Sequence, residues 1–279
     1  MPDHLQILHR DDHLVAVHKP SGLLVHRSEL DRHETRFALQ MVRDQIGQRV
    51  WATHRLDKGT SGILLFALDP GTASLVGRQF ENGEVAKRYF AVVRGHPPES
   101  GLIDHSLVRQ RDPYEFVGEQ SSTEAQPAQT RFQRLAVAEI PYPVDRYPTS
   151  RYGLVALEPL TGRRHQIRRH LKHISHPVIG DATYGKGRHN RLFTELFGNR
   201  RLLLACTGLA LRHPQQDRPM AITAPLADDF KAILKSFDWA VPDAALTAPG
   251  GNNMIFQPEF PADSLPSPGF PPCQPNEIP

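Results

Sequence analysis

The sequence predicts an α/β protein of the α+β type, built on a mixed, mostly antiparallel sheet flanked by helices and loops. Apolar residues alternate in segments 5–9 and 14–18, with a polar turn between them, which is typical of an antiparallel hairpin. A strand-like run follows at 85–95, and apolar residues at helical spacing in 35–47 predict a helix between these strands. Strands and helices therefore mix along one chain, as in an α+β domain.

Local signals place the ends of the first elements. The first helix ends at Gly47, because glycine readily adopts the left-handed conformation that follows a last helical turn. Residues 51–53 form a short strand. Asp69 followed by Pro70 is typical of an N-cap and a first helical position, so a second helix runs to about residues 82–83.

The remaining elements follow after residue 100. In order, they are short strands at 102–103 and 107–108, a mobile loop at 118–123, strands at 130–140 and 151–160, two runs that complete the sheet at 202–206 and 209–211, and a closing helix at 227–239.

Residues 1–240 are predicted to form one folded domain, and residues 241–279 a disordered, proline-rich tail. The chain has 279 residues, of which 39% are hydrophobic and 23% charged, enough for a well-buried core. The tail holds ten prolines, four acidic residues and no Lys or Arg. The formal net charge is therefore +3 for the whole chain but +7 for residues 1–240. A basic body of this kind favours a polyanionic partner.

The sequence has neither the features of a membrane protein nor those of a secreted protein. No apolar run approaches the roughly 20 residues that a membrane helix needs, and residues 1–10 lack the apolar region of a signal peptide. Two cysteines, Cys206 and Cys273, supply neither a disulfide framework nor a four-ligand zinc site. The sequence therefore predicts a cytoplasmic protein.

Segment 54–62, with the sequence HRLDKGTSG, places one carboxylate, Asp57, in a loop before the apolar run 63–68. Arg55 and Lys58 flank it, and a nearby positive charge favours the ionised form of a carboxylate. An ionised carboxylate in a partly dry cleft can act as a nucleophile or a base. The same residue types also suit an ordinary turn between two strands.

A second candidate segment, 161–171, is rich in cations. Helical spacing predicts an amphipathic helix with Arg164 and Arg168 on one face and Ile167 and Leu171 on another. A metal site is rejected here because the histidine spacing is not H-E-x-x-H and no nearby carboxylate or thiol completes a ligand set. The histidines concerned are His165, His170, His173 and His176.

These segments together resemble the motifs of the RluA-type pseudouridine synthase family. Segment 54–62 is similar to the family pattern H-R-L-D-x-x-T-S-G, and an apolar strand follows it. The other matching segments are KPSGLLVH at 19–26, KRY at 87–89, TGRRHQIRRH at 161–170 and HPVIGDATYG at 176–185. The resemblance covers about residues 5–239, which makes residues 1–240 the expected catalytic domain.

The resemblance implies a fold, a reaction and a set of site residues. It implies the pseudouridine synthase fold with a central RNA-binding cleft, and conversion of uridine to pseudouridine. Asp57 would be the nucleophile, Tyr89 would pack on the target base, and Arg168 would pair with Asp57. The residues expected to bind substrate are His54, Arg55, Thr60, Lys87, Arg163, His165 and Gln166. This reaction needs no redox cofactor, metal or nucleotide.

Within the family, the chain resembles most the members that modify uridine 65 in the T-stem region of tRNA. The expected partner is therefore tRNA, bound by a monomer that has no membrane attachment and no nucleotide cofactor. Two alternatives stay open, the same reaction on ribosomal RNA and a non-catalytic RNA-binding protein. A glycoside hydrolase ranks last, because it needs a second carboxylate as its acid and the motifs around Asp57, Tyr89 and Arg168 contain only one.

Overall fold

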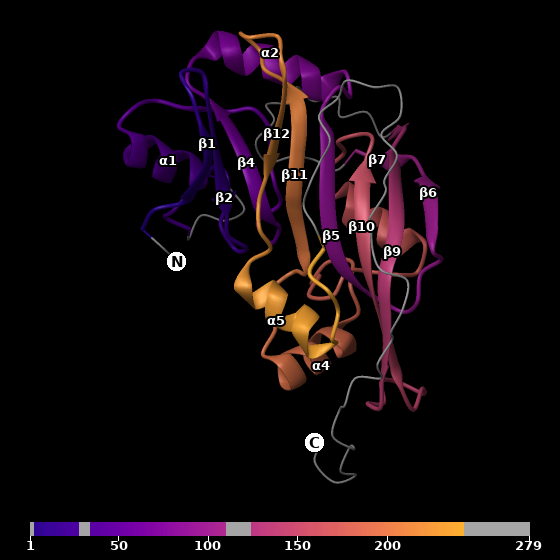
Figure 1. Cartoon of the computed structure of the whole chain (residues 1–279). Helices are drawn as coiled ribbons and strands as arrows, with labels where there is room; N and C mark the ends of the chain where they lie inside the picture. Colours follow the sequence, from indigo (N-terminus) through magenta and orange to yellow (C-terminus); the bar gives the residue numbers. More distant parts are fainter. Residues whose placement is uncertain (1–2, 28–33, 110–123, 243–279) are drawn as a thin grey trace.

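A computed structural model describes residues 3–27, 34–109 and 124–242 of the chain. Within these ranges the centre is a ten-stranded sheet, in which eight strands follow the order β1-β2-β4-β11-β5-β10-β9-β6 (Figure 1). The other two strands are β3, paired with β4, and β12, paired with β11. Every pairing in this sheet is antiparallel except that of β4 with β11, so the predicted mixed, mostly antiparallel sheet is confirmed.

The strands of the main sheet are β1 (Gln6–Arg10), β2 (Leu14–Lys19), β3 (Trp51–Ala52), β4 (Ser61–Ala67), β5 (Ala86–Arg94), β6 (Ser100–Asp104), β9 (Gln129–Ile140), β10 (Ser150–Pro159), β11 (Leu204–Arg212) and β12 (Pro219–Thr223). A separate two-stranded sheet pairs β7 (Leu107–Val108) with β8 (Ala125–Gln126). The helices are α1 (Ala38–Ile46), α2 (Pro70–Glu81), α3 (Gln166–His173), α4 (Gly187–Phe197) and α5 (Asp228–Ser236).

Helices cover both faces of the main sheet. Alternation along β5 separates the faces, because Phe90 and Val92 pack with α4 and α5 whereas Ala91 and Val93 pack with α3. Tyr89 contacts the clusters beneath both α2 and α3, so these two helices share one face. The other face carries α1, α4 and α5. Figure 1 shows α2 at one end of the sheet and α4 with α5 at the opposite end.

Local signals explain why several predicted elements are confirmed. The hairpin of β1 and β2 is antiparallel, as the alternation predicts. The Asp69 side chain accepts a hydrogen bond from the Thr72 backbone N–H at 2.8 Å, and Pro70 is the first residue of α2. Helix α1 ends at Gly47, whose φ of 73° is left-handed.

Several elements differ from the prediction. The two predicted runs at 202–206 and 209–211 are one strand, β11, and the elements α4, β8 and β12 were not predicted. Helix α4 starts at Gly187, and its apolar residues, Leu192, Phe193, Leu196 and Phe197, all lie in its second half. The predicted mobile loop at 118–123, Cys273 and residues 243–279 of the predicted tail lie outside the described residues. Within the described ranges, no helix is long and apolar enough to cross a membrane.

A glycine brings the strand of the central motif against β11. Ser61 and Gly62 pair with Ala205 and Cys206 in the parallel contact between β4 and β11. Gly62 has a φ of +116°, and a Cβ atom on it would lie 1.9 Å from the backbone oxygen of Cys206. Both the backbone conformation and the lack of space therefore require glycine.

We predict that Gly62→Ala destabilises the protein by more than about 1 kcal/mol, because alanine at a positive φ is strained and its methyl group meets fixed backbone. The control is Gly77→Ala in α2, where a Cβ atom meets nothing within 4 Å. This substitution should stabilise the helix by roughly 0.5–1 kcal/mol. Midpoints of thermal unfolding, followed by circular dichroism, measure both effects. Equal midpoints for the two variants would show that the close approach of Gly62 to the Cys206 backbone does not exclude a side chain at position 62.

Candidate active site

The Asp57 loop connects β3 to β4 and is fixed by backbone hydrogen bonds at both ends. The Thr60 N–H donates to the Asp57 carbonyl at 3.0 Å, which closes a turn around Asp57. The segment that follows β2 contacts this turn from the side. The Gly22 N–H donates to the Lys58 carbonyl at 2.8 Å, and the Ser21 hydroxyl donates to the Gly59 carbonyl at 2.7 Å. Segment 19–26, which matches the KPSGLLVH motif of the family, therefore supports the Asp57 turn directly.

Lys19 is a fully buried cation beneath the same turn. Its Nζ donates hydrogen bonds to the carbonyls of Pro20, Leu23 and Lys58 at 3.0, 2.7 and 3.2 Å. Burial lowers the pKa of Lys19 to about 7, because a charged ammonium loses its hydration there. Three carbonyl acceptors match the three N–H donors of an ammonium, so this arrangement favours the protonated form. Lys19 thus joins the end of β2 to the Asp57 loop.

His54 was expected to bind substrate, and the structure places it in the cleft wall with its ring engaged by the protein. The Leu65 backbone N–H donates to its Nε2 at 3.1 Å, and the ring stacks on Phe80 with 4.8 Å between centroids. Burial lowers the pKa of His54 to about 4, and the charge of Lys87 acts in the same direction. A neutral imidazole at this position ties the start of the loop to β4 and to α2.

Arg168 joins Asp57 to a second carboxylate, Asp181. Its Nη1 donates to Asp57 Oδ2 at 3.0 Å, so the pairing implied by the family resemblance is present. Its Nε and Nη2 donate to the two oxygens of Asp181 at 2.7 and 2.8 Å. Burial acts to lower the pKa of Arg168, but the hydrogen bond to Asp181 and the charge of Asp57 outweigh burial and raise it. The guanidinium is therefore a fixed cation beside the candidate nucleophile.

Asp181 is a site residue that the sequence analysis missed. Its side chain is fully buried, and its Oδ1 also accepts from the backbone N–H groups of Thr183 and Tyr184, both at 2.9 Å. Asn190 of α4 holds the same turn, since it accepts from the Gly180 N–H and donates to the Asp181 carbonyl. Asp181 lies in segment 176–185, which resembles a family motif, but no local pattern showed that it would contact Arg168.

His165 lies on the other side of Asp57. Its Nε2 is 3.9 Å from Asp57 Oδ1, and its Nδ1 is 3.0 Å from the Tyr184 hydroxyl. The backbone of His165 has a φ of 55°, an uncommon conformation for a residue other than glycine that tends to occur at functional sites. Burial lowers the pKa of His165, with the charge of Asp57 opposing the shift.

Tyr89 and Lys87 project from β5 into the floor of the cleft. Burial raises the pKa of Tyr89 well above its usual value of 10, and the neighbouring Cys206 thiol adds to the shift. Tyr89 is therefore a neutral phenol at pH 7, which suits a flat surface for stacking. Burial lowers the pKa of Lys87, whose Nζ lies 3.5 Å from the Thr161 carbonyl.

A cleft of about 840 Å³ joins these residues. It crosses the face of the sheet between the end of α2 and the start of α3. Ten predicted site residues line it, namely His54, Arg55, Asp57, Thr60, Lys87, Tyr89, Arg163, His165, Gln166 and Arg168. These ten residues come from three separate segments of the chain, 54–60, 87–89 and 163–168, which the fold brings together.

The polar atoms of Gln166 are all used within the protein. Its Oε1 accepts from the Thr161 hydroxyl and the Arg163 N–H, and its Nε2 donates to the Gln129 carbonyl and the Thr130 hydroxyl. An amide side chain has two acceptor sites and two donors, so Gln166 holds the start of α3 rather than presenting free polar atoms.

The prediction that Arg164 and Arg168 lie on one face of a helix is wrong. Helix α3 begins only at Gln166, because His165 before it is left-handed and Arg164 lies in the preceding turn. Arg168 instead belongs to the buried side of α3 with Ile167 and Leu171. Among the described residues, no group of three or more His, Cys, Asp or Glu side chains is arranged to hold a metal ion.

The low pKa of His54 predicts a pH dependence of stability. The unfolded chain takes up a proton on this histidine near pH 6.5, whereas the folded protein does so only near pH 4. The free energy of unfolding should therefore fall as the pH drops from about 6.5 to 4.

In His54→Gln, whose Oε1 can accept the Leu65 N–H without titrating, this decrease should be smaller. Urea unfolding of both proteins at several pH values measures the difference. Parallel curves for the two proteins would show that His54 does not contribute.

Comparison with known proteins identifies the family of the chain. Residues 13–173 match a family model described as RNA pseudouridylate synthase. The chain is 45% identical over 244 residues to tRNA pseudouridine synthase C of Vibrio vulnificus (strain CMCP6), which covers 88% of this chain and 99% of that protein. It is 47% identical to tRNA pseudouridine synthase C of Pasteurella multocida (strain Pm70), over 84% of this chain and 97% of that one.

Two solved structures have the same fold. Human RNA Pseudouridylate Synthase Domain Containing 1 aligns with a TM-score of 0.61 and 26% identity, over 80% of this chain and 84% of that one. Human RNA Pseudouridylate Synthase Domain Containing 4 also has a TM-score of 0.61, with 27% identity over 82% of this chain and 92% of that one. With its motifs, its cleft and these relatives in agreement, the chain belongs to the RNA pseudouridylate synthase family.

Proposed function

We propose that the protein converts a uridine of tRNA to pseudouridine, at position 65 in the T-stem region, with Asp57 as the nucleophile. The observation that carries the proposal is the ion pair of Asp57 with the buried Arg168 beside a cationic cleft. The substrate is supported by the relatives named tRNA pseudouridine synthase C, which match most of the chain. We expect the protein to act as a monomer in the cytoplasm.

The reaction is an isomerisation, so its atoms balance without a co-reactant. The bond from N1 of the base to C1′ of the ribose breaks, the base turns, and C5 bonds to C1′. C5 then loses its proton, and N1 gains one. The chain must therefore supply a nucleophile, a surface that holds the detached base, and groups that move a proton.

Asp57 is placed to supply the nucleophile. Its side chain is 26% exposed and opens into the cleft, while Arg168 holds one of its oxygens. The carboxylate could attack C1′ of the ribose, attack C6 of the base, or assist formation of a glycal. All three routes need the carboxylate at a fixed position, which the hydrogen bond from Arg168 provides.

Tyr89 and Arg55 have separate roles in this proposal. A base within a stem must leave the helix before it can react, at a cost of a few kcal/mol. Arg55, exposed at the cleft beside Asp57, would fill the space that the base leaves. Tyr89, held as a neutral phenol in the cleft floor, would stack on the flipped base.

Release of tritium from tRNA transcripts labelled at C5 of uridine tests the proposal, because pseudouridine formation removes the C5 hydrogen. Mapping of the modified position then identifies the target. Release at one T-stem uridine would support both the reaction and the substrate. Release only from ribosomal RNA would keep the reaction and change the substrate, whereas release from neither RNA would favour a binding protein without activity.

We predict that Asp57→Asn lowers turnover roughly thousandfold or more, since the amide is not a nucleophile. The amide has nearly the shape of the carboxylate, so the thermal midpoint and the affinity for tRNA should stay close to those of the original protein. Single-turnover tritium release and filter binding measure these quantities. Substantial turnover by a folded Asp57→Asn protein would exclude Asp57 as the nucleophile.

We also predict that Arg168→Lys lowers kcat about ten- to hundredfold while KM changes little. A lysine has one point charge and cannot bridge Asp57 and Asp181 as a guanidinium does. The matched control is Arg131→Lys, because the Arg131 side chain is 57% exposed and lies 3.5 Å from Glu158, outside the cleft. Similar kinetics for both variants would show that the bridge is not needed for the reaction.

A further inference from the structure

A second groove of about 900 Å³ begins where the first cleft ends. Both are lined by Asp57, Lys58, His165 and Arg168, so the candidate nucleophile lies between them. From there the second groove runs along residues 197–202 to the first turns of α5. Part of its wall is the Gly180–Asp181 turn that supports Arg168.

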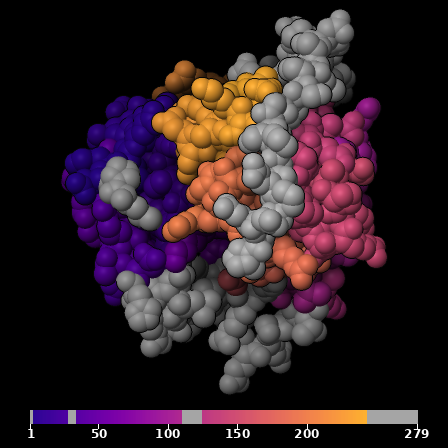
Figure 2. Space-filling model, turned by 90° about the horizontal axis from the view of Figure 1, so that it is seen from below, coloured from indigo at the N-terminus to yellow at the C-terminus, as the bar shows by residue number. Residues whose placement is uncertain are grey.

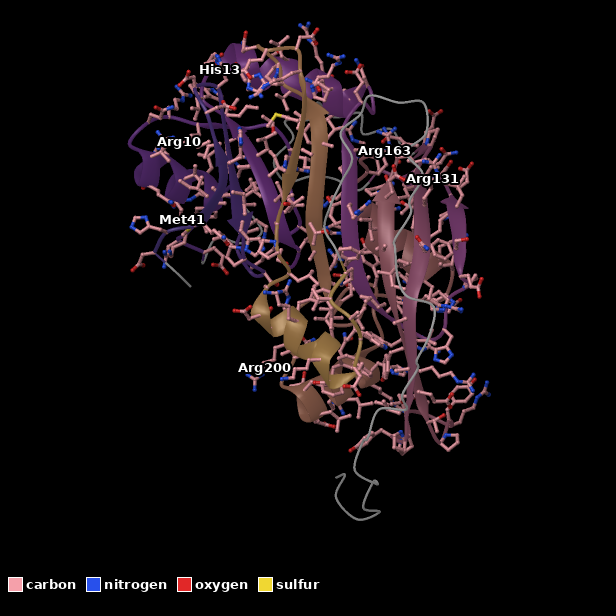
Figure 3. The ribbon with its side chains drawn as sticks, viewed as in Figure 1. Arg10, His13, Met41, Arg131, Arg163 and Arg200 are labelled. Atoms are coloured by element: carbon pink, nitrogen blue, oxygen red, sulfur yellow. The ribbon has the colours of Figure 1, made fainter. Side chains whose placement is uncertain are left out.

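The two grooves extend in opposite directions from Asp57. The first reaches the end of α2 and Arg163, and the second reaches Arg200. Figure 3 shows Arg163 toward the α2 end of the sheet and Arg200 beside α4 and α5 at the other end. Viewed from that end in Figure 2, α5 and the α4 region lie at the surface next to the N-terminal part of the chain. The space around Asp57 is therefore open on two sides.

A groove on both sides of the reacting group suits a polymer substrate. A free nucleoside would need only one pocket, whereas a nucleotide within RNA has a neighbour on its 5′ side and another on its 3′ side. Each neighbour carries a phosphate, and phosphate contacts supply most of the affinity for nucleic acids. The two grooves therefore match the two directions in which an RNA strand leaves its target nucleotide.

The charges of the second groove favour a polyanion at its outer end. Two of its carboxylates already contact cations, since Asp181 binds Arg168 and Asp229 binds Arg201 at 2.7 Å. Arg201 has an exposed side-chain fraction of only 8%, and its Nη2 also donates to the Ser61 hydroxyl at 2.6 Å. Arg200 is exposed and makes no hydrogen bond or ion pair with the described part of the chain.

We infer that this second groove binds the phosphodiester backbone of the RNA on one side of the target uridine, with Arg200 contacting a phosphate. The inference rests on the proposed function, because it assigns the second groove to the same RNA. Arg201 then has a different role, since it fixes the groove wall to the start of β4 next to the Asp57 loop.

Steady-state kinetics of Arg200→Gln on the tRNA transcript test the inference. We expect KM to rise about three- to tenfold with kcat unchanged, because a phosphate contact positions RNA without joining the chemistry. The salt dependence of binding should weaken by about one unit of slope. The matched control is Arg10→Gln, since Arg10 is exposed on the edge strand β1, outside both grooves (Figure 3). This control should match the original protein.

Shortened RNAs locate the contact. Two sets of transcripts are trimmed progressively, one from the 5′ flank of the target uridine and one from the 3′ flank. Trimming one flank should abolish the difference in KM between Arg200→Gln and the original protein. Two results would show that the groove assignment is wrong in a protein that makes pseudouridine. The first is that Arg200→Gln has the same KM and salt slope as the original protein. The second is that neither trim removes the difference in KM between them. If the original protein makes none, the proposed function itself fails.

Discussion

The site depends on one buried guanidinium shared by two carboxylates. Arg168 bonds Asp57 through one nitrogen and Asp181 through two others, and these three residues come from the loop before β4, from α3 and from the turn before α4. A buried charge is costly unless its partners are well placed. Loss of the Arg168 side chain would leave both carboxylates, Asp57 and Asp181, without the cation that they share. The chemistry and the packing of three chain segments therefore share the same contacts.

Hydrogen bonds from several protein groups hold the backbone of the Asp57 loop, and Arg168 holds the Asp57 side chain. The buried Lys19 and the segment that follows β2 bind its carbonyls, while His54 ties its first residues to β4. Backbone hydrogen bonds and buried cations keep a loop in place without large apolar side chains. The loop can thus present a carboxylate to solvent while its own backbone stays ordered. Arg55 and Arg163 are exposed at the rim of the cleft, outside these supporting contacts of the loop.

Local signals in the sequence predicted most strands, whereas the family resemblance predicted the residues of the cleft. The cap at Asp69, the stop at Gly47 and the alternation of β1 and β2 act over a few residues, so they can be read without the fold. Long-range effects could not be predicted in this way. The start of α3 depends on the left-handed His165, and the role of Asp181 depends on a contact across 13 residues with Arg168. The role of Gln166 was also hidden, because its partners Gln129 and Thr130 lie on β9.

Cys206 of β11 stands between Gly62 of β4 and Tyr89 of β5 in the register of the sheet. The spacing between the Asp57 loop and Tyr89 is therefore fixed by the backbone of the sheet, at a position, Gly62, where only glycine fits. Substitutions at the exposed rim of the cleft therefore leave the distance between Asp57 and Tyr89 unchanged, because that distance depends on the sheet and not on the rim. The rim and the floor of the cleft can thus vary independently of each other.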